Sequence, residues 1–380
     1  MKRYTKLLAV FLAGAMILSS CGNAHDDRGR DRDGDKTSET DLKDNGSGDG
    51  EAGDANADGS GSGDENPEPE KWVPFVLEKL EFDESEYPAP KYDFDTEEVT
   101  LEMEGITREY RIAVVNDIHM ITDKESGDVW EDYMPTLRTR HDYMFITGDG
   151  VYAEDLWPEI VKYLNHNDFD AILFAGDLID YCSNSNITAL KNGLNELRYP
   201  ADRMLYIRSD HDYGAWYGGN VYTEVRSAYA QTYLFDSDRD PKYLDLGEFG
   251  VIGYNRSYRN MYEEEVAYYE EKMDGEQPLI FLTHVPFYSD VDESLYNLSM
   301  EVRQKIYYWS NDEGAGYSPD ANTQKIIDKM YNGESNVQLI VAAHMHESWD
   351  GQVSENMRQH IYGPDFRGQI GILHITPKSE

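Results

Sequence analysis

Five apolar runs in this sequence end on a residue type that can bind a metal ion. The runs end at Asp117, Asp177, Asp210, His284 and His344. In open α/β sheets, ligand sites form outside the carboxyl ends of the strands, so side chains at such ends can converge. His346 follows His344 by two residues and would lie on the same side of an extended chain. One such ending could begin an ordinary surface loop, but five predict a shared polar site.

The residues around these endings supply carboxylate oxygens and imidazole nitrogens. The candidate groups are Asp117-Ile118-His119, Gly176-Asp177-Leu178-Ile179-Asp180, Asp210-His211-Asp212, His284 and His344-Met345-His346. This donor set suits divalent Mn, Fe, Zn or Co. It is too large for one tetrahedral zinc ion, and it contains no thiolate. Two ions bridged by one carboxylate would use all of these groups.

The elements that position these groups alternate between helical and strand-like segments. The amphipathic helical segments are residues 156–167, 187–198, 223–233, 263–273 and 323–331. They alternate with short apolar runs, which is typical of an α/β domain with a largely parallel sheet. Residues 71–109 are predicted as an irregular lead-in and the first hairpin, which turns at Gly105 and has a second arm ending at Asp117. The main domain is predicted to span residues 110–380.

The order of the motifs resembles that of the calcineurin-like metallophosphoesterase family, whose pattern is DxH, GDxxD, GNH[DE], a single His and GHxH. The match runs from Asp117 to His346. The resemblance implies a four-layer αββα sandwich with two metal ions. It implies that Asp117, His119, Asp177 and His346 surround one ion, and that Asp177, Asp210, His284 and His344 surround the other. Asp177 would bridge the two ions.

The same resemblance predicts an enzyme that hydrolyses phosphate esters. Two cations lower the pKa of a water molecule between them, so that a bridging hydroxide can attack, and they neutralise charge on the phosphoryl oxygens. His211 and Asp212 are the predicted catalytic residues. His211 would protonate the leaving oxygen, while Asp212 or Asp180 would orient the site. The alternative for His211 is a structural role beside the metal ligands.

Two positions depart from the family pattern. Ser209-Asp210 replaces Gly-Asn, and Ala343 replaces the Gly before the paired histidines. Asp210 can still bind a metal ion, but it adds a negative charge and lacks the amide donor that could bind phosphate. A surface binding protein that keeps the fold without turnover is therefore the alternative function. An enzyme acting on polymers or lipids of the cell envelope is a third possibility.

The N-terminal residues predict an exported protein with a lipid anchor. Residues 1–21 combine a cationic start, a short apolar run and Leu18-Ser19-Ser20-Cys21, and they are predicted as a signal peptide. The last four residues resemble the lipobox of bacterial lipoproteins. The resemblance implies that a lipidated Cys21 holds the protein on the extracytoplasmic face of the cell membrane. A plain cleaved signal or a short anchor is the alternative.

Composition predicts a long linker and disfavours some partners. Residues 22–70 contain 16 acidic and 5 basic residues and almost no aliphatic or aromatic side chain, which predicts a disordered acidic linker. The formal net charge of the chain is −40, which disfavours nucleic acid and anionic lipid headgroups as partners. Cys182 is the only other cysteine besides Cys21, so no disulfide is predicted.

Overall fold

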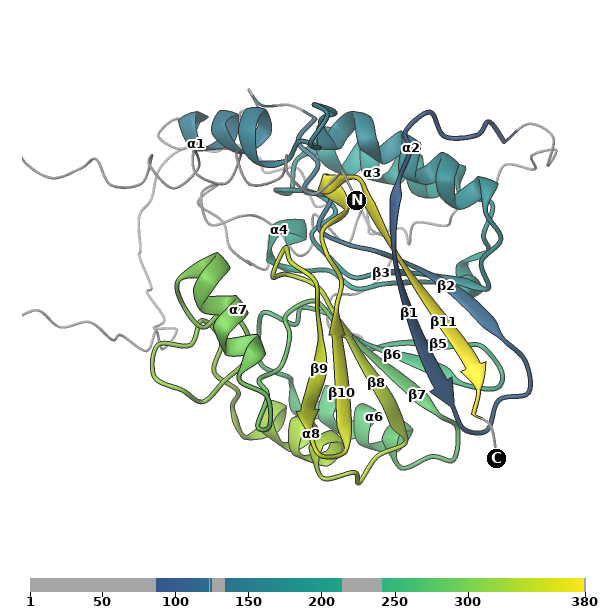
Figure 1. Cartoon of the computed structure of the whole chain (residues 1–380), viewed down its shortest axis with the longest axis vertical. Coiled ribbons are helices and arrows are strands. Elements are labelled where there is room, and N and C mark those ends of the chain that lie inside the picture. The colour runs from purple at the N-terminus through teal and green to yellow at the C-terminus, as the bar shows by residue number, and fades with distance from the viewer. Residues whose placement is uncertain (1–86, 123, 125–133, 214–240, 379–380) are drawn as a thin grey trace, which may run out of the picture. The chain divides into compact units, whose positions relative to one another are not determined.

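Two β-sheets face each other in this protein, and helices cover their outer faces (Figure 1). The computed structural model describes residues 87–122, 124, 134–213 and 241–378. The predicted signal peptide at 1–21, the linker at 22–70 and the helix at 223–233 lie outside the described residues.

In the first sheet, the C-terminal strand lies between the two strands that begin the domain. In spatial order the strands are β1 (Asp95–Met103), β11 (Gln369–Pro377), β2 (Tyr110–Val115), β3 (Ala171–Phe174) and β4 (Met204–Tyr206). β1 is parallel to β11, β11 is antiparallel to β2, and β2, β3 and β4 are parallel. The predicted hairpin is therefore wrong, because its arms are strands that pair with β11 instead of each other. Alternating apolar residues indicate a strand but do not identify its partner.

The second sheet is parallel apart from its two edge strands. In spatial order its strands are β5 (Lys242–Asp245), β6 (Gly250–Tyr254), β7 (Leu279–Thr283), β8 (Val337–Ala342), β10 (Met357–Ile361) and β9 (Trp349–Ser354). β6, β7, β8 and β10 run parallel, whereas β5 and β9 are antiparallel to their neighbours. Strands and helices alternate along the chain, as the sequence predicts for an α/β domain.

The helical segments lie on the outer faces of the sheets or in the loops between strands. They are α1 (Met134–Thr139), the π-helical turn η4 (Arg140–Met144), α2 (Ala153–His166), α3 (Asn184–Glu196), the 3₁₀ turn η5 (Ala201–Arg203), α4 (Asp210–Tyr213), α6 (Glu263–Met273), α7 (Ser294–Arg303), α8 (Ala321–Tyr331) and the 3₁₀ turn η7 (Asp365–Arg367). α2, α3, α6 and α8 confirm predicted helices. α7 was not among the predicted helices. Its Tyr296 and Met300 are exposed, which weakens the amphipathic pattern.

Side-chain alternation along the strands produces four layers. Val115 of β2 packs with the apolar side chains of α2 and α3, while the preceding Val114 faces the second sheet. Phe281 of β7 packs with α6 and α8, and the following Leu282 faces the first sheet. Strands that are buried on both faces need nearly continuous apolar sequences, such as AILF in β3. The predicted αββα sandwich is confirmed (Figure 1).

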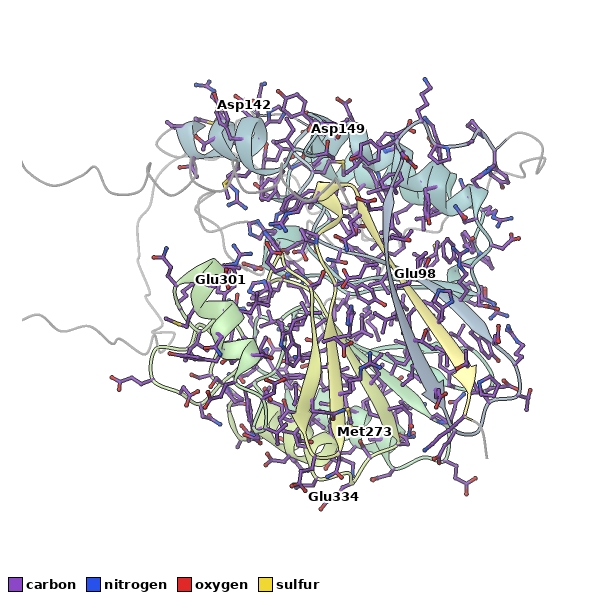
Figure 2. All side chains as sticks on the ribbon, viewed as in Figure 1. Glu98, Asp142, Asp149, Met273, Glu301 and Glu334 are labelled. Carbon is purple, nitrogen blue, oxygen red and sulfur yellow. The ribbon has the colours of Figure 1, made fainter. Side chains whose placement is uncertain are left out.

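Acidic side chains cover much of the surface. Asp149, Glu301 and Glu334 are exposed and lie at the periphery of the domain (Figure 2). Solvated carboxylates of this kind explain how a chain with a net charge of −40 can also bury an apolar core. Among the residues described, no helix is both long enough and apolar enough to cross a membrane.

One buried histidine links the two sheets through charged partners. His360 of β10 places Nε2 at 3.0 Å from Glu97 Oε1 in β1 and Nδ1 at 2.8 Å from Asp350 Oδ2 in β9. Burial lowers the pKa of His360, but the hydrogen bonds that it donates to Asp350 and Glu97 raise the pKa more, so the net shift is upward. The charged imidazole therefore stabilises the fold at low pH, and this contribution is lost as pH rises through the raised pKa.

His360→Gln is expected to lower the free energy of unfolding by about 1–3 kcal/mol at pH 6, because the partly buried Glu97 and the exposed Asp350 lose a buried, charged donor. The difference from wild type should shrink toward pH 9, as the wild-type imidazole loses its charge through the raised pKa. Urea unfolding at both pH values measures this change. An equal difference at pH 6 and pH 9 would contradict the assignment of charge to His360.

Candidate metal centre

The predicted ligands lie at the carboxyl ends of parallel strands from both sheets. In the first sheet, Asp117 follows β2, Asp177 follows β3 and Asp210 follows β4. In the second sheet, His284 directly follows β7 and His344 lies two residues after β8. Because the strands in each set run parallel, their ends lie at the same edge of the sandwich. The structure brings six of the seven predicted ligands together at this edge, while their metal binding stays a prediction.

Donor atoms from six of the predicted ligands and from His211 form three overlapping groups. The groups are Asp117 with His119 and His346, His119 with Asp177 and His211, and Asp177 with His284 and His344. Asp177 Oδ2 lies 3.5 Å from His119 Nε2 and 3.2 Å from His284 Nε2. Neighbouring ligand atoms around an ion with bonds of about 2.1 Å are about 3.0–3.4 Å apart. The spacing therefore fits metal coordination, and Asp177 belongs to two groups.

Two carboxylate oxygens in these groups have no hydrogen-bond partner among the described residues. They are Asp117 Oδ1 and Asp177 Oδ1, and both are buried. The other oxygen of Asp117 accepts from Asn116 Nδ2 at 2.9 Å and from His344 N at 3.0 Å. Burial raises the pKa of both aspartates, but neighbouring imidazoles, foremost His284, lower each well below its ordinary value. Ionised, buried and unsatisfied oxygen atoms fit a cation, so these residues suit divalent metal ions.

Second hydrogen bonds fix which nitrogen each imidazole turns toward the site. His119 Nδ1 donates to Asp180 Oδ1 at 2.9 Å, and His284 Nδ1 donates to Ala175 O at 2.8 Å. His211 Nδ1 donates to Asp180 O at 2.7 Å. Each ring therefore presents Nε2 to the other donors. Metal-binding histidines commonly use their second nitrogen in this way.

The backbone of the ligand loops is strained. Five predicted ligands have left-handed φ angles, namely Asp117 (48°), His119 (51°), Asp177 (53°), His344 (74°) and His346 (57°). Each such residue costs about 1–3 kcal/mol, and such strain clusters at functional sites. Gly176 has φ +94°, and a Cβ there would lie 3.0 Å from His284 Nδ1 and from Ser209 Cβ. The tight turns aim side chains inward and leave no room for a larger residue at position 176.

The imidazoles differ in their electrostatic environment. Burial lowers the pKa of His346 to about 3 and that of His344 well below its ordinary value. Burial also lowers the pKa of His211 and His284, but Asp177 and neighbouring carboxylates raise it in each case to about 10. Metal binding requires neutral imidazole, so binding at His284 would release a proton.

The region that contains the ligand groups matches a known family. Residues 110–348 match the family model described as calcineurin-like phosphoesterase. The chain belongs to the calcineurin-like phosphoesterase family. Membership supports metal-dependent hydrolysis of phosphate esters and confirms the family expected from the motifs. No curated protein matches the chain.

The chain is similar to several solved structures at low sequence identity and with TM-scores below 0.5. A dimetal phosphatase from Danio rerio is 10% identical, with a TM-score of 0.44, over 69% of this chain and 89% of its own. Purple acid phosphatase PPD1 from yellow lupin (Lupinus luteus) seeds is 16% identical, with a TM-score of 0.39, over 69% and 45%. PhoD is 11% identical, with a TM-score of 0.40, over 71% and 59%. Family membership rests on the sequence match and not on these likenesses.

The departures from the phosphoesterase family pattern have local explanations. Asp210 begins α4 and accepts from Ser209 Oγ at 2.9 Å. Among the described residues it belongs to none of the three ligand groups, so metal binding by Asp210 stays a prediction. Ala343 is buried between the sheets and has no left-handed φ. The left-handed angles fall on the two histidines that follow, so this loop needs no glycine at position 343.

Asp180 and Asp212 are fully buried and position the phosphoesterase site. Asp180 accepts from Arg140 Nε at 3.0 Å and Nη2 at 2.6 Å, and it also binds His119. Asp212 accepts from the backbone amides of Ser209 at 2.9 Å and Asp177 at 3.0 Å. Burial is the largest cause that raises the pKa of Asp212, and repulsion from the Asp177 carboxylate is the next. Together they raise this pKa to about 6. Both acids contact groups that hold the predicted ligands, while the orienting role expected of Asp212 or Asp180 stays a prediction. Because Asp212 is fully buried, it would act as a positioning residue.

Several side chains beside the ligands were not predicted from the sequence. Phe145 stacks on His119 with ring centroids 4.3 Å apart, and Tyr307 stacks on His344 at 4.2 Å. Arg140 lies in the long segment between the first two motifs, and Arg140 itself belongs to no motif. Tyrosine occurs 29 times in the chain, so residue type alone could not single out Tyr307.

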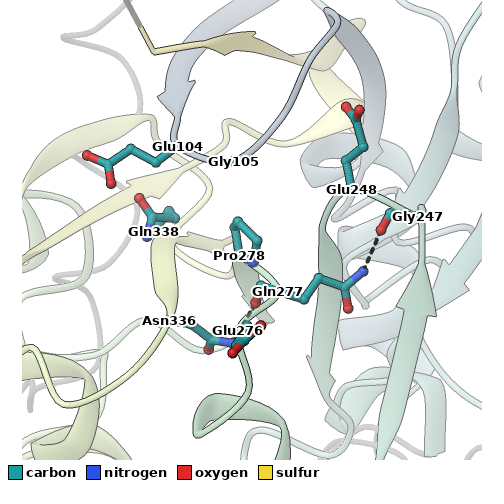
Figure 3. Close-up of a pocket in the computed structure, with 9 residues that line it drawn as sticks. All are labelled: Glu104, Gly105, Gly247, Glu248, Glu276, Gln277, Pro278, Asn336 and Gln338. Atoms are coloured by element: carbon teal, nitrogen blue, oxygen red, sulfur yellow. Dashed lines mark hydrogen bonds between the residues drawn. The ribbon is translucent and has the colours of Figure 1, made fainter. Parts of the chain in front are cut away.

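Two cavities lie at opposite edges of the second sheet. Figure 3 shows a cavity of about 580 Å³ whose lining includes Glu104, Pro278 and Asn336. Pro278 and Asn336 immediately precede β7 and β8, so this cavity lies at the edge opposite the predicted ligands. A second cavity, of about 400 Å³, includes Tyr317, whose hydroxyl lies 3.1 Å from His344 Nε2. The smaller cavity is therefore the one beside the metal centre.

Proposed function

We propose that the protein hydrolyses phosphate esters at a dinuclear metal centre in which Asp177 lies between the two ions. The observation that carries the proposal is the position of Asp177, whose carboxylate belongs to two ligand groups and whose Oδ1 is buried without a hydrogen-bond partner. One ion would be held by Asp117, His119 and His346, and the other by His284 and His344.

His211 is the proposed proton donor. Bound divalent cations supply Lewis acidity and acidify water near neutral pH. The chain supplies an imidazolium for the leaving oxygen, because carboxylates raise the pKa of His211 against the effect of burial. Asp180 fixes this ring through its backbone oxygen, and Arg140 balances the charge of the Asp180 carboxylate.

Metal analysis combined with turnover tests the proposal. Protein purified without chelator is expected to contain two divalent ions per chain and to hydrolyse a chromogenic phosphate monoester or diester. Chelation should abolish turnover, and Mn, Fe, Zn or Co should restore it. His211→Gln is expected to keep both ions and to lose about a hundredfold or more in kcat.

The outcomes separate the proposed function from its alternative. One ion per chain would contradict the dinuclear centre. Two ions without turnover of either ester class would favour a surface binding protein, which the extra negative charge of Asp210 keeps as the second candidate. A fall in metal content in His211→Gln would contradict its assignment as proton donor.

We further propose that the enzyme acts on the outer side of a membrane through a lipidated Cys21. The support is the cationic, apolar and small-residue order that ends at Leu18-Ser19-Ser20-Cys21. Cys21→Ala is expected to abolish incorporation of a labelled fatty acid and to release the chain from the membrane fraction. A wild-type chain that takes up no label would contradict lipidation.

A further inference from the structure

His344 is oriented differently from the other imidazoles of the metal centre. His119, His284 and His346 turn Nε2 toward neighbouring ligand atoms. In His344, Nδ1 lies 3.1 Å from His284 Nε2, and Nε2 lies 3.1 Å from the hydroxyl of Tyr317. His344 therefore presents the opposite ring nitrogen to the centre, and Tyr317 is the partner of its other nitrogen.

The partner of the second nitrogen decides which nitrogen of the ring can hold an ion. A ring nitrogen that binds a metal ion carries no proton, so in a neutral ring the proton lies on the other nitrogen. With an ion at Nδ1, His344 donates from Nε2, and the Tyr317 hydroxyl can accept because it has lone pairs beside its own proton. At His284, the carbonyl oxygen of Ala175 has the corresponding place.

The neighbouring segment fixes the position of Tyr317. Tyr317 O accepts from Ser310 N at 3.0 Å, and residue 317 forms an isolated β-bridge with Trp309. Trp309 is buried, and its Nε1 donates to Ser257 O at 2.7 Å. The rings of Tyr317 and Trp309 have centroids 5.7 Å apart. These contacts hold the Tyr317 ring beside His344.

Other contacts hold His344 independently of this hydroxyl. The ring of Tyr307 stacks on the imidazole with centroids 4.2 Å apart and an interplanar angle of 18°. Arg303 Nη2, at the end of α7, donates to the backbone oxygens of His344 and Met345 at 3.1 Å each. These bonds hold a backbone with a left-handed φ of 74° at His344. Removal of the Tyr317 hydroxyl alone should therefore leave both the loop and the ring in place.

We infer that Tyr317 is a positioning residue of the metal centre, whose hydroxyl accepts the Nε2 proton of His344 and thereby makes Nδ1 the atom that binds an ion. It acts on the ion held by His284 and His344 and leaves the other ion of the centre unaffected. The inference rests on the proposed dinuclear centre, because it assigns a residue that orients one of its ligands. Tyr317 lies in the loop before α8, outside the motifs of the family pattern.

Metal titration of the chelator-treated full chain tests this role without turnover. Co²⁺ is a suitable probe, because calorimetry gives its affinity and its visible absorption reports the ligand geometry. Wild type is expected to bind two ions. Tyr317→Phe, which keeps the ring, should lower the affinity for one ion about tenfold to a hundredfold, change the absorption of that ion and leave the affinity for the other ion unchanged. Equal affinities in Tyr317→Phe and wild type would overturn the inference.

Tyr199→Phe is the matched control, because it also removes a tyrosine hydroxyl that makes hydrogen bonds inside the domain. That hydroxyl lies 3.1 Å from Leu164 O and 2.6 Å from Asn167 O. It also accepts from Phe169 N at 3.2 Å, just before the amino end of β3, so it lies at the edge opposite the ligands. Tyr199→Phe should leave both affinities unchanged. A loss equal to that in Tyr317→Phe would indicate a general effect of stability and overturn the inference.

Substitutions of His344 identify the nitrogen through which Tyr317 acts. The Oδ1 of asparagine is bonded to Cγ, as Nδ1 is, whereas the Oε1 of glutamine lies one atom further out, as Nε2 does. His344→Asn should therefore keep more affinity than His344→Gln for the ion that Tyr317→Phe affects. In the His344→Asn background, Tyr317→Phe should have no further effect, because no Nε2 proton remains to be accepted. Tighter binding in His344→Gln, or the full loss in the double variant, would overturn the inference.

These metal measurements separate the inference from ester hydrolysis. Two ions in wild type, with one of them weakened in Tyr317→Phe, would support the inference even if no phosphate ester were hydrolysed, and only the proposed enzyme function would fail. Ester turnover with two bound ions and unchanged affinities in Tyr317→Phe would overturn the inference and leave the enzyme function standing.

Discussion

Asp177→Asn is expected to lower kcat/KM for phosphate esters by about a thousandfold or more. Asp177 belongs to two ligand groups, and it is the residue whose loss would affect both proposed ions. The asparagine keeps the shape of the side chain but removes its charge, so His284 loses the carboxylate nearest to it. The variant should therefore fold normally while binding fewer than two ions.

The measurement is steady-state turnover with each metal, together with metal content and circular dichroism. Asp274→Asn is the matched control, because Asp274 is exposed and pairs with Lys329 at 2.7 Å on the surface of the second sheet's helices. This control should keep both turnover and metal content. Wild-type turnover with two bound ions in Asp177→Asn would contradict the proposed bridging position.

Asp212→Ala is expected to lower the free energy of unfolding by about 3–5 kcal/mol. The buried carboxylate accepts from Ser209 N at 2.9 Å, Asp177 N at 3.0 Å and Tyr206 Oη at 3.0 Å. It also accepts from Leu178 N at 3.2 Å. Alanine would leave these donors buried without an acceptor, and each unsatisfied group carries a desolvation cost.

Urea unfolding of chelator-treated protein measures this effect without a contribution from bound metal. Asp212→Asn is the informative comparison, because its amide oxygen can still accept from one or two of the same donors, so a smaller loss is expected. Asp274→Ala controls for removal of an exposed aspartate. If Asp212→Ala were no more destabilising than Asp274→Ala, the structural role assigned to Asp212 would be wrong.

Local sequence patterns were sufficient for most elements of the fold. Apolar periodicity predicted α2, α3, α6 and α8, because each helix buries one face against a sheet. Apolar runs predicted the parallel strands, because both faces of each sheet are covered. The predicted hairpin was wrong because the partner of β1 and β2 lies more than 250 residues away, in β11. Period-two alternation contains no information about so distant a neighbour.

In the predicted site, too, local patterns were sufficient for some residues and not for others. Motif order identified the candidate ligands, but not the residues that contact and orient them. Arg140 binds Asp180 from a segment without a recognisable motif, and Tyr317 approaches His344 from a loop before α8. The aromatic and arginine residues of the adjacent cavity also come from loops. Their roles depend on loop geometry, for which residue type and spacing give no signal.

By itself, the sequence determined the α/β class from local periodicity, and the family and the candidate metal ligands from the order of short motifs. The four-layer architecture followed from the resemblance to that family. Only the tertiary structure decided that Asp177 belongs to two ligand groups, that Asp180 serves both His119 and His211, and that an arginine-lined cavity adjoins His344. The physical reason is that these relations join side chains far apart in the chain. Distances of about 3 Å between such atoms are set by the packing of both sheets and their strained loops.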